Sequence, residues 1–298
     1  MTGFSVDWLR LREPFDRAAR EPAAGTSDLF GRVARWRDRS PSTSFAVIDL
    51  ACGHGANLRA LAPRLGGMQH WRLVDHDPQL LAALPHELAA WARQRGYTFK
   101  AADGAGDAPT EVIGPGFHAK VLRERVDLAR DLATLDFGEA SLVTASALLD
   151  LVSASWLQRL IRKAQDSRSA MWFGLNVDGR LTWEPADPDD VRVHKLFSEH
   201  QRRDKGFGLA LGPHAVPFAI GQMTDAGYDT HQTRTDWDID GAQAPEMQLA
   251  MIEGMVAAAL EQDPSAHDTV RAWKTRRGAG LGASRLRVGH VDIVATPA

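Results

Sequence analysis

The apolar residues of this chain follow two spacings, one typical of helices and one typical of buried strands. Residues 1–40 place apolar side chains on one helix face and arginines on the other, which predicts amphipathic helices. Residues 45–50 form a short run that is apolar apart from Asp49, which predicts a strand buried on both faces of a sheet. Gly53 and Gly55 then predict a turn, and residues 56–65 return to helical spacing. The chain is therefore expected to open with helices, followed by a strand, a turn and a helix.

The same alternation continues to the last residues. A second strand, residues 71–75, ends at Asp75, and Asp77 followed by Pro78 is a strong helix start, because the acid caps the helix and proline fits its first turn. Residues 96–120 are rich in glycine and are interpreted as an insertion with an added hairpin. Strands that alternate with helices predict an α/β fold with a doubly wound, seven-stranded, mostly parallel sheet. The five further strands are predicted at residues 125–129, 141–145, 170–177, 228–237 and 285–295.

Composition and charge limit the kinds of protein that this chain can be. With 298 residues, 44% of them hydrophobic and 24% charged, it is expected to form a globular domain with a full core. The formal charge of −3 argues against a nucleic-acid partner, because no basic surface is expected to neutralise phosphates. No uncharged apolar run approaches the roughly 20 residues that span a bilayer, so neither a membrane span nor export is expected. The single cysteine, Cys52, excludes an intrachain disulfide and fits a reducing, cytoplasmic location.

Candidate chemistry gathers where the predicted strands end. Ligands of open α/β sheets bind beyond the carboxyl ends of the strands, and the segment from Asp49 to Gly55 lies at such an end. The two glycines there let the backbone approach a ligand closely, although such a pair also serves an ordinary tight turn. Asp75 ends the second predicted strand and Asp131 follows the third, so three acids are expected at one edge of the sheet. Their carboxylates suit the ammonium, the ribose hydroxyls and the adenine amine of one ligand.

An NAD-dependent oxidoreductase is one function that these residues could serve. An acid twenty residues after the glycines also suits the ribose of NAD. A dinucleotide fingerprint needs a third glycine or an alanine three positions after Gly55, however, and position 58 is leucine. The glycine spacing therefore argues against an oxidoreductase.

With these residues the chain resembles the class I S-adenosylmethionine-dependent methyltransferases, over roughly residues 44–177. The resemblance lies in residues 47–55 (Val-Ile-Asp-Leu-Ala-Cys-Gly-His-Gly), in residues 74–78 (Val-Asp-His-Asp-Pro) and in the pair Asp131-Leu132. It implies a Rossmann-like seven-stranded sheet whose last strand is antiparallel, with S-adenosylmethionine as the cofactor. The residues that it implies for the cofactor are Asp49, Ala51, Gly53 and Gly55 for methionine, Asp75 for the ribose, His76, Asp131 and Leu132 for the adenine, and Ser146 near the sulfonium.

Candidate catalytic residues lie on the charged helix predicted around residues 187–204. Methyl transfer from a sulfonium is an in-line displacement, so a base is required only when the acceptor must lose a proton. His194 and His200 are the candidate bases, and Asp204 stands four residues after His200, where an acid can orient the ring. A helix this dense in charge is also typical of a solvated face. Candidate substrate-binding residues are Asp150, Trp183, Phe197, Arg203 and Phe207.

A metal site is not predicted. His194 and His200 lie six positions apart and so point to different sides of a helix. Asp187, Asp189 and Asp190 stand at the start of that helix, where capping and the helix dipole explain them without Mg²⁺.

The sequence is interpreted as an enzyme that transfers a methyl group to a small molecule. Residues 1–40 are expected to form a helical cap on a domain of residues 41–298, with insertions at about 96–120 and 178–217 on the substrate side. The Asn/Asp-Pro-Pro-aromatic turn used on exocyclic amines of bases is absent after the fourth predicted strand, which favours a small acceptor. Two further functions stay open at this point, an RNA methyltransferase and a non-catalytic nucleoside-binding protein of the same fold.

Overall fold

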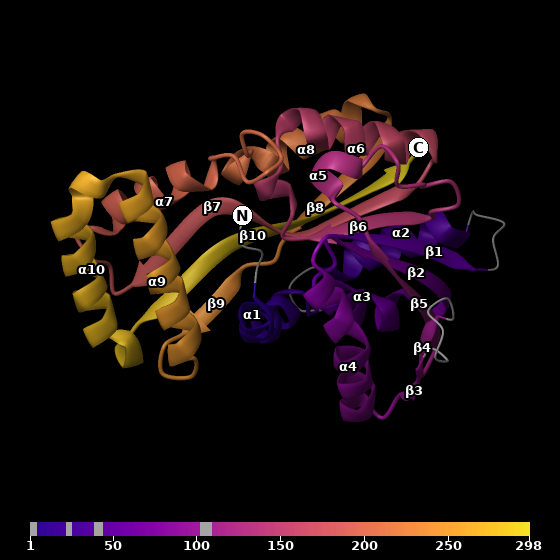
Figure 1. Ribbon diagram of the computed structural model, residues 1–298, viewed down its shortest axis with the longest axis horizontal. Helices are drawn as coiled ribbons and strands as arrows, with labels where there is room; N and C mark the ends of the chain where they lie inside the picture. Colours follow the sequence, from indigo (N-terminus) through magenta and orange to yellow (C-terminus); the bar gives the residue numbers. More distant parts are fainter. Residues whose placement is uncertain (1–4, 22–25, 39–43, 102–108) are drawn as a thin grey trace.

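A computed structural model describes residues 5–21, 26–38, 44–101 and 109–298 of the chain (Figure 1). Its centre is a ten-stranded sheet with the order β3-β4-β5-β2-β1-β6-β7-β10-β8, and β9 pairs with β10. The strands are β1 (Phe45–Leu50), β2 (Gly67–Asp75), β3 (Thr98–Lys100), β4 (Thr110–Gly114), β5 (Phe117–Arg125), β6 (Leu142–Ser146), β7 (Ala170–Glu184), β8 (Tyr228–Arg234), β9 (Trp237–Asp240) and β10 (Arg285–Pro297).

The middle of the sheet is parallel and its far edge is not. β5, β2, β1, β6 and β7 pair in parallel with one another, whereas β10 pairs antiparallel with both β7 and β8. The predicted doubly wound, mostly parallel sheet with an antiparallel last strand is therefore confirmed, with extra strands beyond the predicted seven. The parallel strands end at the same edge, and the order reverses between β1 and β6, where ligands of such sheets bind.

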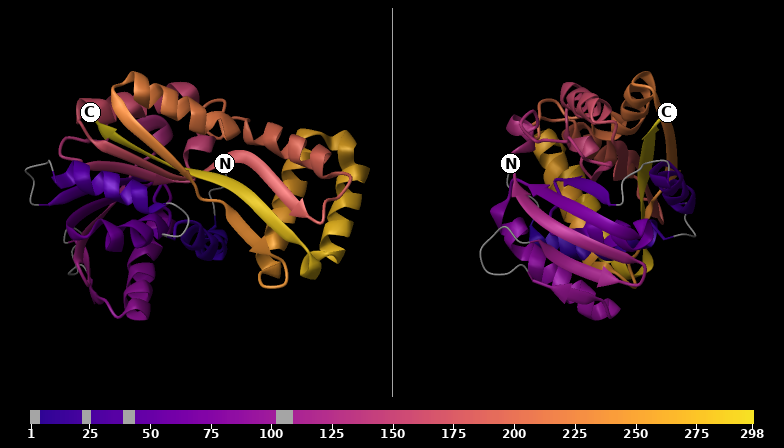
Figure 2. Two further views of the ribbon diagram at one scale, coloured as in Figure 1. Left: turned by 180° about the vertical axis from the view of Figure 1, so that it is seen from behind. Right: turned by 90° about the vertical axis from the view of Figure 1, so that its right-hand side faces the viewer.

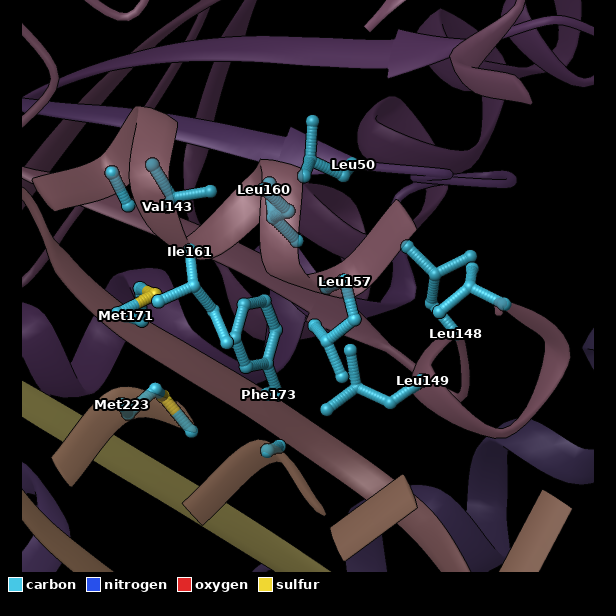
Figure 3. Close-up of a cluster of buried hydrophobic side chains, with 14 of the residues drawn as sticks. Leu50, Val143, Leu148, Leu149, Leu157, Leu160, Ile161, Met171, Phe173 and Met223 are labelled. Carbon is cyan, nitrogen blue, oxygen red and sulfur yellow. The ribbon is translucent and has the colours of Figure 1, made fainter. Parts of the chain in front are cut away.

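Helices cover both faces of the sheet. α6 (Ala154–Asp166) and α8 (Ala215–Asp225) lie above it in Figure 1, and α3 (Ala56–Leu65) and α4 (Pro78–Arg95) lie below it. The upper layer closes on a core that includes Leu157, Ile161 and Phe173, drawn in Figure 3. The lower layer encloses a second core around Trp71 and Leu84, which α2 (Thr26–Asp38) also covers. Among the described residues, no helix is both long and apolar enough to cross a bilayer.

Strands β7 and β10 continue well beyond the rest of the sheet and carry an appended region with its own core. α7 (Asp190–Gln201), α9 (Pro245–Gln262), α10 (His267–Ala279) and strand β9 pack on this extension, which gives the molecule its elongated outline in Figure 2. The core of the region includes Trp183 and Trp273, whose rings meet edge-on with centroids 6.1 Å apart. The guanidinium of Arg277 lies 4.5 Å from the centre of the Trp183 ring.

The prediction of the third strand at residues 125–129 is wrong. The third parallel strand is β5, which begins at Phe117 inside the predicted insertion, and residues Leu128–Asp131 form the short helix α5. A tight turn at Gly116 (φ 78°) joins β5 to β4, so the predicted hairpin is present but includes the third strand itself. β5 buries only its alternate residues and ends in charged ones, which hides it from a search for a continuous apolar run.

Candidate functional site

The loop after β1 is held in a backbone conformation that favours glycine. Gly53 (φ 55°) and Gly55 (φ 84°) both lie in the left-handed region, and so does Ala51 (φ 51°). A Cβ on Gly55 would lie 2.7 Å from a methyl group of Leu84, so close packing of α3 against α4 also requires a glycine there. The loop turns the chain sharply from β1 into α3 and leaves its amides facing the end of the neighbouring strand β2.

Asp75, at the end of β2, fixes this loop and the next one. Its Oδ2 accepts a hydrogen bond from the Gly53 amide at 2.9 Å, and its Oδ1 accepts one from the Asp77 amide at 3.0 Å. The Asp75 side chain is 5% exposed, whereas that of His76 beside it is 63% exposed, with Nδ1 3.3 Å from Asp75 Oδ1. Asp77 caps α4 by accepting from the Gln79 amide, as predicted. The carboxylate thus joins the ends of β1 and β2.

Asp49, inside β1, is a buried acid with one unused oxygen. Its Oδ1 accepts from Nδ2 of Asn57 at 2.8 Å, whereas Oδ2 has no hydrogen-bond partner in the described part of the chain. Burial raises the pKa of Asp49 to about 7; the Asn57 hydrogen bond and the charge of Arg20 lower it, and the charge of Asp75 raises it further. A buried carboxyl group of this kind favours a cationic ligand, because a cation stabilises its ionised form.

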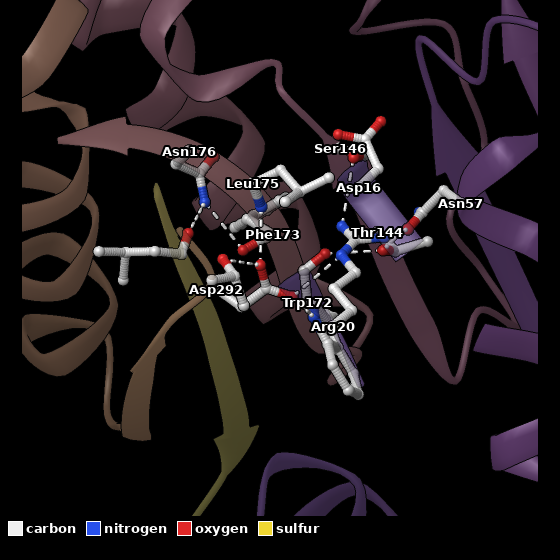
Figure 4. A network of polar contacts seen from close by, with 12 residues as sticks. Asp16, Arg20, Asn57, Thr144, Ser146, Trp172, Phe173, Leu175, Asn176 and Asp292 are labelled. Carbon is white, nitrogen blue, oxygen red and sulfur yellow. Dashed lines mark hydrogen bonds and ion pairs between the residues drawn. The ribbon is translucent and has the colours of Figure 1, made fainter. Parts of the chain in front are cut away.

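A buried polar network joins Asn57, the hydrogen-bond partner of Asp49, to the ends of β6 and β7 (Figure 4). Arg20, which follows helix α1 (Val6–Ala19), donates to Asn57 Oδ1 at 3.0 Å and to Ser146 Oγ at 3.2 Å. Its Nε lies 3.3 Å from Asp292 Oδ2 on β10. Asp292 is itself fully buried and accepts from the Leu175 amide at 2.7 Å. The network therefore fixes the predicted sulfonium residue, Ser146, relative to three strands.

Helix α1 covers the loop after β1. The side chain of Arg59 on α3 forms two hydrogen bonds with Glu13 on α1, at 2.8 and 2.6 Å, and Arg10 on α1 pairs with Glu87 on α4 at 2.6 Å. His54, in the loop, is buried between these groups, and burial together with the charge of Arg59 lowers its pKa. Helix α1 is thus held against the loop after β1 by side chains of α3 and α4.

The acid expected to follow the third strand, Asp131, is not at a strand end. It is exposed at the end of α5, and Leu132 next to it is buried in the upper core. The acid that follows β5 is Asp127, which caps α5 by accepting from the Ala129 amide at 3.0 Å. The expectation for Asp131 depended on a strand at residues 125–129, and it loses its basis because that strand is absent.

The residues predicted around the acceptor occupy two separate places. Asp150 lies just after β6 in the short helix η2 (Leu149–Leu151), is 8% exposed, and has an Oδ1 without a hydrogen-bond partner among the described residues. Burial raises its pKa to about 6. Phe207 is near the same end of the sheet, with its ring edge-on to Trp156 of α6 at 5.3 Å.

The other predicted acceptor residues belong to the appended region. Trp183 is in its core, and His194 and Phe197 of α7 line a small gap of about 20 Å³ against β7 and β10. His200 Nε2 lies 3.2 Å from Glu261 of α9, to which Arg203 also binds at 2.8 Å. The expectation that Asp204 orients His200 is wrong, because both bonds of that carboxylate go to the amides of Gly206 and Gly208.

The acids before α7 serve structure through arginines as well as through capping. Arg276 of α10 binds Asp187 at 2.7 Å and Asp189 at 2.6 Å, and Arg277 binds Asp190. The Arg276 hydrogen bonds lower the pKa of Asp187 to about 2. Within the described ranges, no group of three or more His, Cys, Asp or Glu side chains is arranged to hold a metal ion.

Sequence reasoning missed Arg20, Asn57 and Asp292. A signal did exist for Asp292, because the residues on either side of it, 291 and 293–295, are apolar, and a charge in such a run needs a buried partner. Arg20 gave no such signal, because it is one of many arginines in a segment predicted to be an amphipathic cap.

Comparisons with known proteins bear on the fold. No family model and no curated protein matches this chain. A cyclopropane-fatty-acyl-phospholipid synthase-like protein from Lactobacillus casei is similar over 99% of this chain and 94% of its own, with 13% identity and a TM-score of 0.50. A methyltransferase from Geobacter sulfurreducens in complex with S-adenosylhomocysteine is similar over 90% of each chain, with 14% identity and a TM-score of 0.40.

A third solved structure, geranyl diphosphate C-methyltransferase from Streptomyces coelicolor, is similar over 90% of this chain and 80% of its own, with 11% identity and a TM-score of 0.38. Identities this low concern the fold alone. The fold assignment rests on the Lactobacillus protein and on the order of the strands, with β10 antiparallel between β7 and β8. This chain has the class I methyltransferase fold.

Proposed function

We propose that this chain binds S-adenosylmethionine at the loop after β1 and transfers its methyl group to a small molecule. One observation carries the proposal: two acids on neighbouring parallel strands, Asp49 and Asp75, flank a loop of left-handed backbone, and Asp75 holds that loop through the Gly53 amide. The loop lies where the strand order of the sheet reverses, between β1 and β6, which is where open α/β sheets bind ligands.

Each part of the cofactor then has a protein group of suitable chemistry. The unused oxygen of Asp49 receives the ammonium of the methionine part, and Asp75 accepts the ribose hydroxyls. Ala51, Gly53 and Gly55 line the methionine part of the cofactor. The exposed His76 covers the adenine ring, and we assign the adenine amine to Asp127 instead of Asp131, because Asp127 follows β5 directly.

The reaction itself needs alignment more than acid–base chemistry. When bound, the sulfonium supplies the methyl group, and the chain orients the acceptor for in-line attack and excludes water. If the acceptor carries a proton that must leave, we assign its removal to Asp150, whose pKa of about 6 leaves it mostly ionised at neutral pH. Asp150 is closer to Ser146 along the chain than His194 or His200, which belong to the appended region.

Replacing Asp75 tests the cofactor site. We expect Asp75→Ala, and less severely Asp75→Asn, to weaken S-adenosylmethionine binding by about tenfold or more in calorimetry, because the ribose loses its acceptor and the Gly53 amide its anchor. The matched control is Asp225→Ala on the far face, an exposed acid at the end of α8, which should bind like the parent. Circular dichroism of the variants keeps loss of fold apart from loss of binding. Parent-like affinity in both Asp75 variants would rule out this placement.

Turnover separates an enzyme from a binding protein of the same fold. Release of S-adenosylhomocysteine in the presence of a panel of small acceptors supports the transferase. Tight cofactor binding with no release from any acceptor supports a non-catalytic nucleoside-binding protein, and salt-sensitive binding of RNA supports an RNA methyltransferase.

A further inference from the structure

A cavity of about 330 Å³ lies on the lower face of the sheet, among α1, α2, α3 and the end of α4. Its lining does not include Asp75 or the loop glycines, so it is distinct from the cofactor site proposed above. It does include Asn57 and Ser146, both of which Arg20 contacts at the ends of the strands. The volume is at the lower end of the range of small-molecule sites.

Arginine is the dominant charged residue around this cavity. Five arginines line it, against three acids. Two of those acids already pair with arginines, because Glu13 binds Arg59 within the lining and Asp16 binds Arg12, which is outside it. The five arginines are Arg17, Arg20, Arg59, Arg64 and Arg95.

The arginines differ in how firmly the protein itself engages them. Arg17 and Arg95 are exposed and form no ion pair with any residue of the described ranges. Arg64 is half-buried, its guanidinium lies 3.7 Å from the centre of the Phe30 ring, and burial together with the charge of Arg20 lowers its pKa. Asp292 already pairs with Arg20, so an anion bound in the cavity would act on the charges of Arg64, Arg17 and Arg95.

The walls of the cavity between these charges are aromatic. The rings of Phe30 and Trp172 meet with centroids 4.4 Å apart, and those of Trp91 and Tyr97 meet edge-on at 5.3 Å. Such walls favour a flat apolar body, whereas guanidinium groups favour a carboxylate or a phosphate, which they can bind through two hydrogen bonds.

We infer that this cavity binds a small organic anion with a planar apolar body, its oxyanion facing Arg17, Arg64 and Arg95. The contact with Ser146 gives the site its role: it is the acceptor pocket, and this role rests on the proposed function. Its ligand is a carboxylate or a phosphate on an aromatic or similarly flat framework.

Binding of simple probes to the full chain, without a methyl donor, tests the site. By calorimetry we expect benzoate or phenyl phosphate to bind, with the stronger of the two identifying the oxyanion, and neutral benzamide to bind about tenfold more weakly or not at all. Affinity for the anions should fall with added salt. Equal binding of benzamide and the anions, or no binding of either anion, overturns the inference.

Variants locate the probes in the cavity. The double variant Arg17→Gln/Arg95→Gln changes only exposed residues and should weaken anion binding about fivefold or more, and Arg64→Met should weaken it further. The matched control, Arg162→Met, removes one exposed arginine from α6 on the opposite face of the sheet and should leave affinity unchanged. If Arg162→Met weakens binding as much as the cavity variants do, the anions bind the surface at large and the inference fails.

Separate titration with S-adenosylmethionine distinguishes this inference from the proposed function. Anion binding in a protein that does not bind S-adenosylmethionine keeps the anion site and removes its role as acceptor pocket. S-adenosylmethionine binding without anion binding overturns the anion site alone.

Discussion

Asp49→Asn is expected to make the unliganded protein more stable at pH 8 and to weaken its binding of S-adenosylmethionine by about tenfold or more. Both effects follow from a fully buried carboxyl group with one unpartnered oxygen. Asparagine has nearly the same shape and keeps an oxygen to accept from Asn57, but it carries no charge that would be costly to bury or that would attract an ammonium.

The direction of the pH dependence follows from the raised pKa. Asp49 has a pKa of about 7 in the folded protein and an ordinary value near 4 in the unfolded chain, so the folded state binds the proton more tightly. The contribution of this group to stability is fully present below about pH 4 and is lost as the pH rises towards 7. Urea unfolding at pH 5 and pH 8 should therefore show the parent losing more free energy of unfolding than Asp49→Asn does, by roughly 2 to 4 kcal/mol.

The raised pKa of Asp49 should also make S-adenosylmethionine binding depend on pH. A cation at Asp49 favours the ionised form, so binding to the parent releases a proton near pH 7, and affinity rises between pH 6 and pH 7.5. Calorimetry in two buffers of different ionisation enthalpy measures that proton. Asp49→Asn should not release it, and equal proton release from the two proteins would show that another group receives the ammonium.

Gly174→Ala, on β7, is expected to lower the free energy of unfolding by about 3 kcal/mol or more. A Cβ at this position would overlap the guanidinium of Arg20, so the arginine must move away. Its departure leaves Asp292 as a fully buried charge without its cation and removes a hydrogen bond to Ser146. Urea unfolding measures the loss, and S-adenosylmethionine affinity should fall with it.

Two comparisons show whether Arg20 is the cause. Gly254→Ala, inside α9, places its Cβ in open space and should be neutral or stabilising by up to about 1 kcal/mol. In an Arg20→Met background the cost of Gly174→Ala should shrink, because the overlapping guanidinium is already gone. An equal cost in both backgrounds would assign the effect to the strand and not to the arginine.

The parts of the fold that the sequence predicts well are those fixed by neighbouring residues. β1 is an apolar run apart from Asp49 because both of its faces are covered, and α4 starts at Asp77-Pro78 because its cap is local. β5 escapes prediction because β4 pairs with it and its buried residues alternate, so no local run of apolar residues marks it. Its boundaries depend on a partner strand.

The residues of the candidate site likewise fall into those that neighbouring sequence predicts and those that it does not. Asp49, Gly53 and Asp75 could be predicted because each stands at the end of a strand that is itself visible in the sequence. Arg20 and Asp292 are brought together only by the folded sheet, and His200 faces Glu261 on another helix instead of the nearby Asp204. Contacts between segments that are distant in sequence produce no regular spacing of residues, so sequence patterns do not predict them.

Solvent does not reach the carboxyl group of Asp49, and helix α1 packs on the loop that follows it. A ligand therefore reaches Asp49 only when the groups around it open, so capture would proceed at the frequency of that opening and not at the rate of diffusion. The ion pair between Arg10 and Glu87, in which the arginine side chain is half-exposed, is one of the contacts that hold α1 to α4. Dissolved ions weaken such pairs. Moderate salt would then quicken the uptake of a charged ligand, the reverse of its usual effect on encounters between opposite charges.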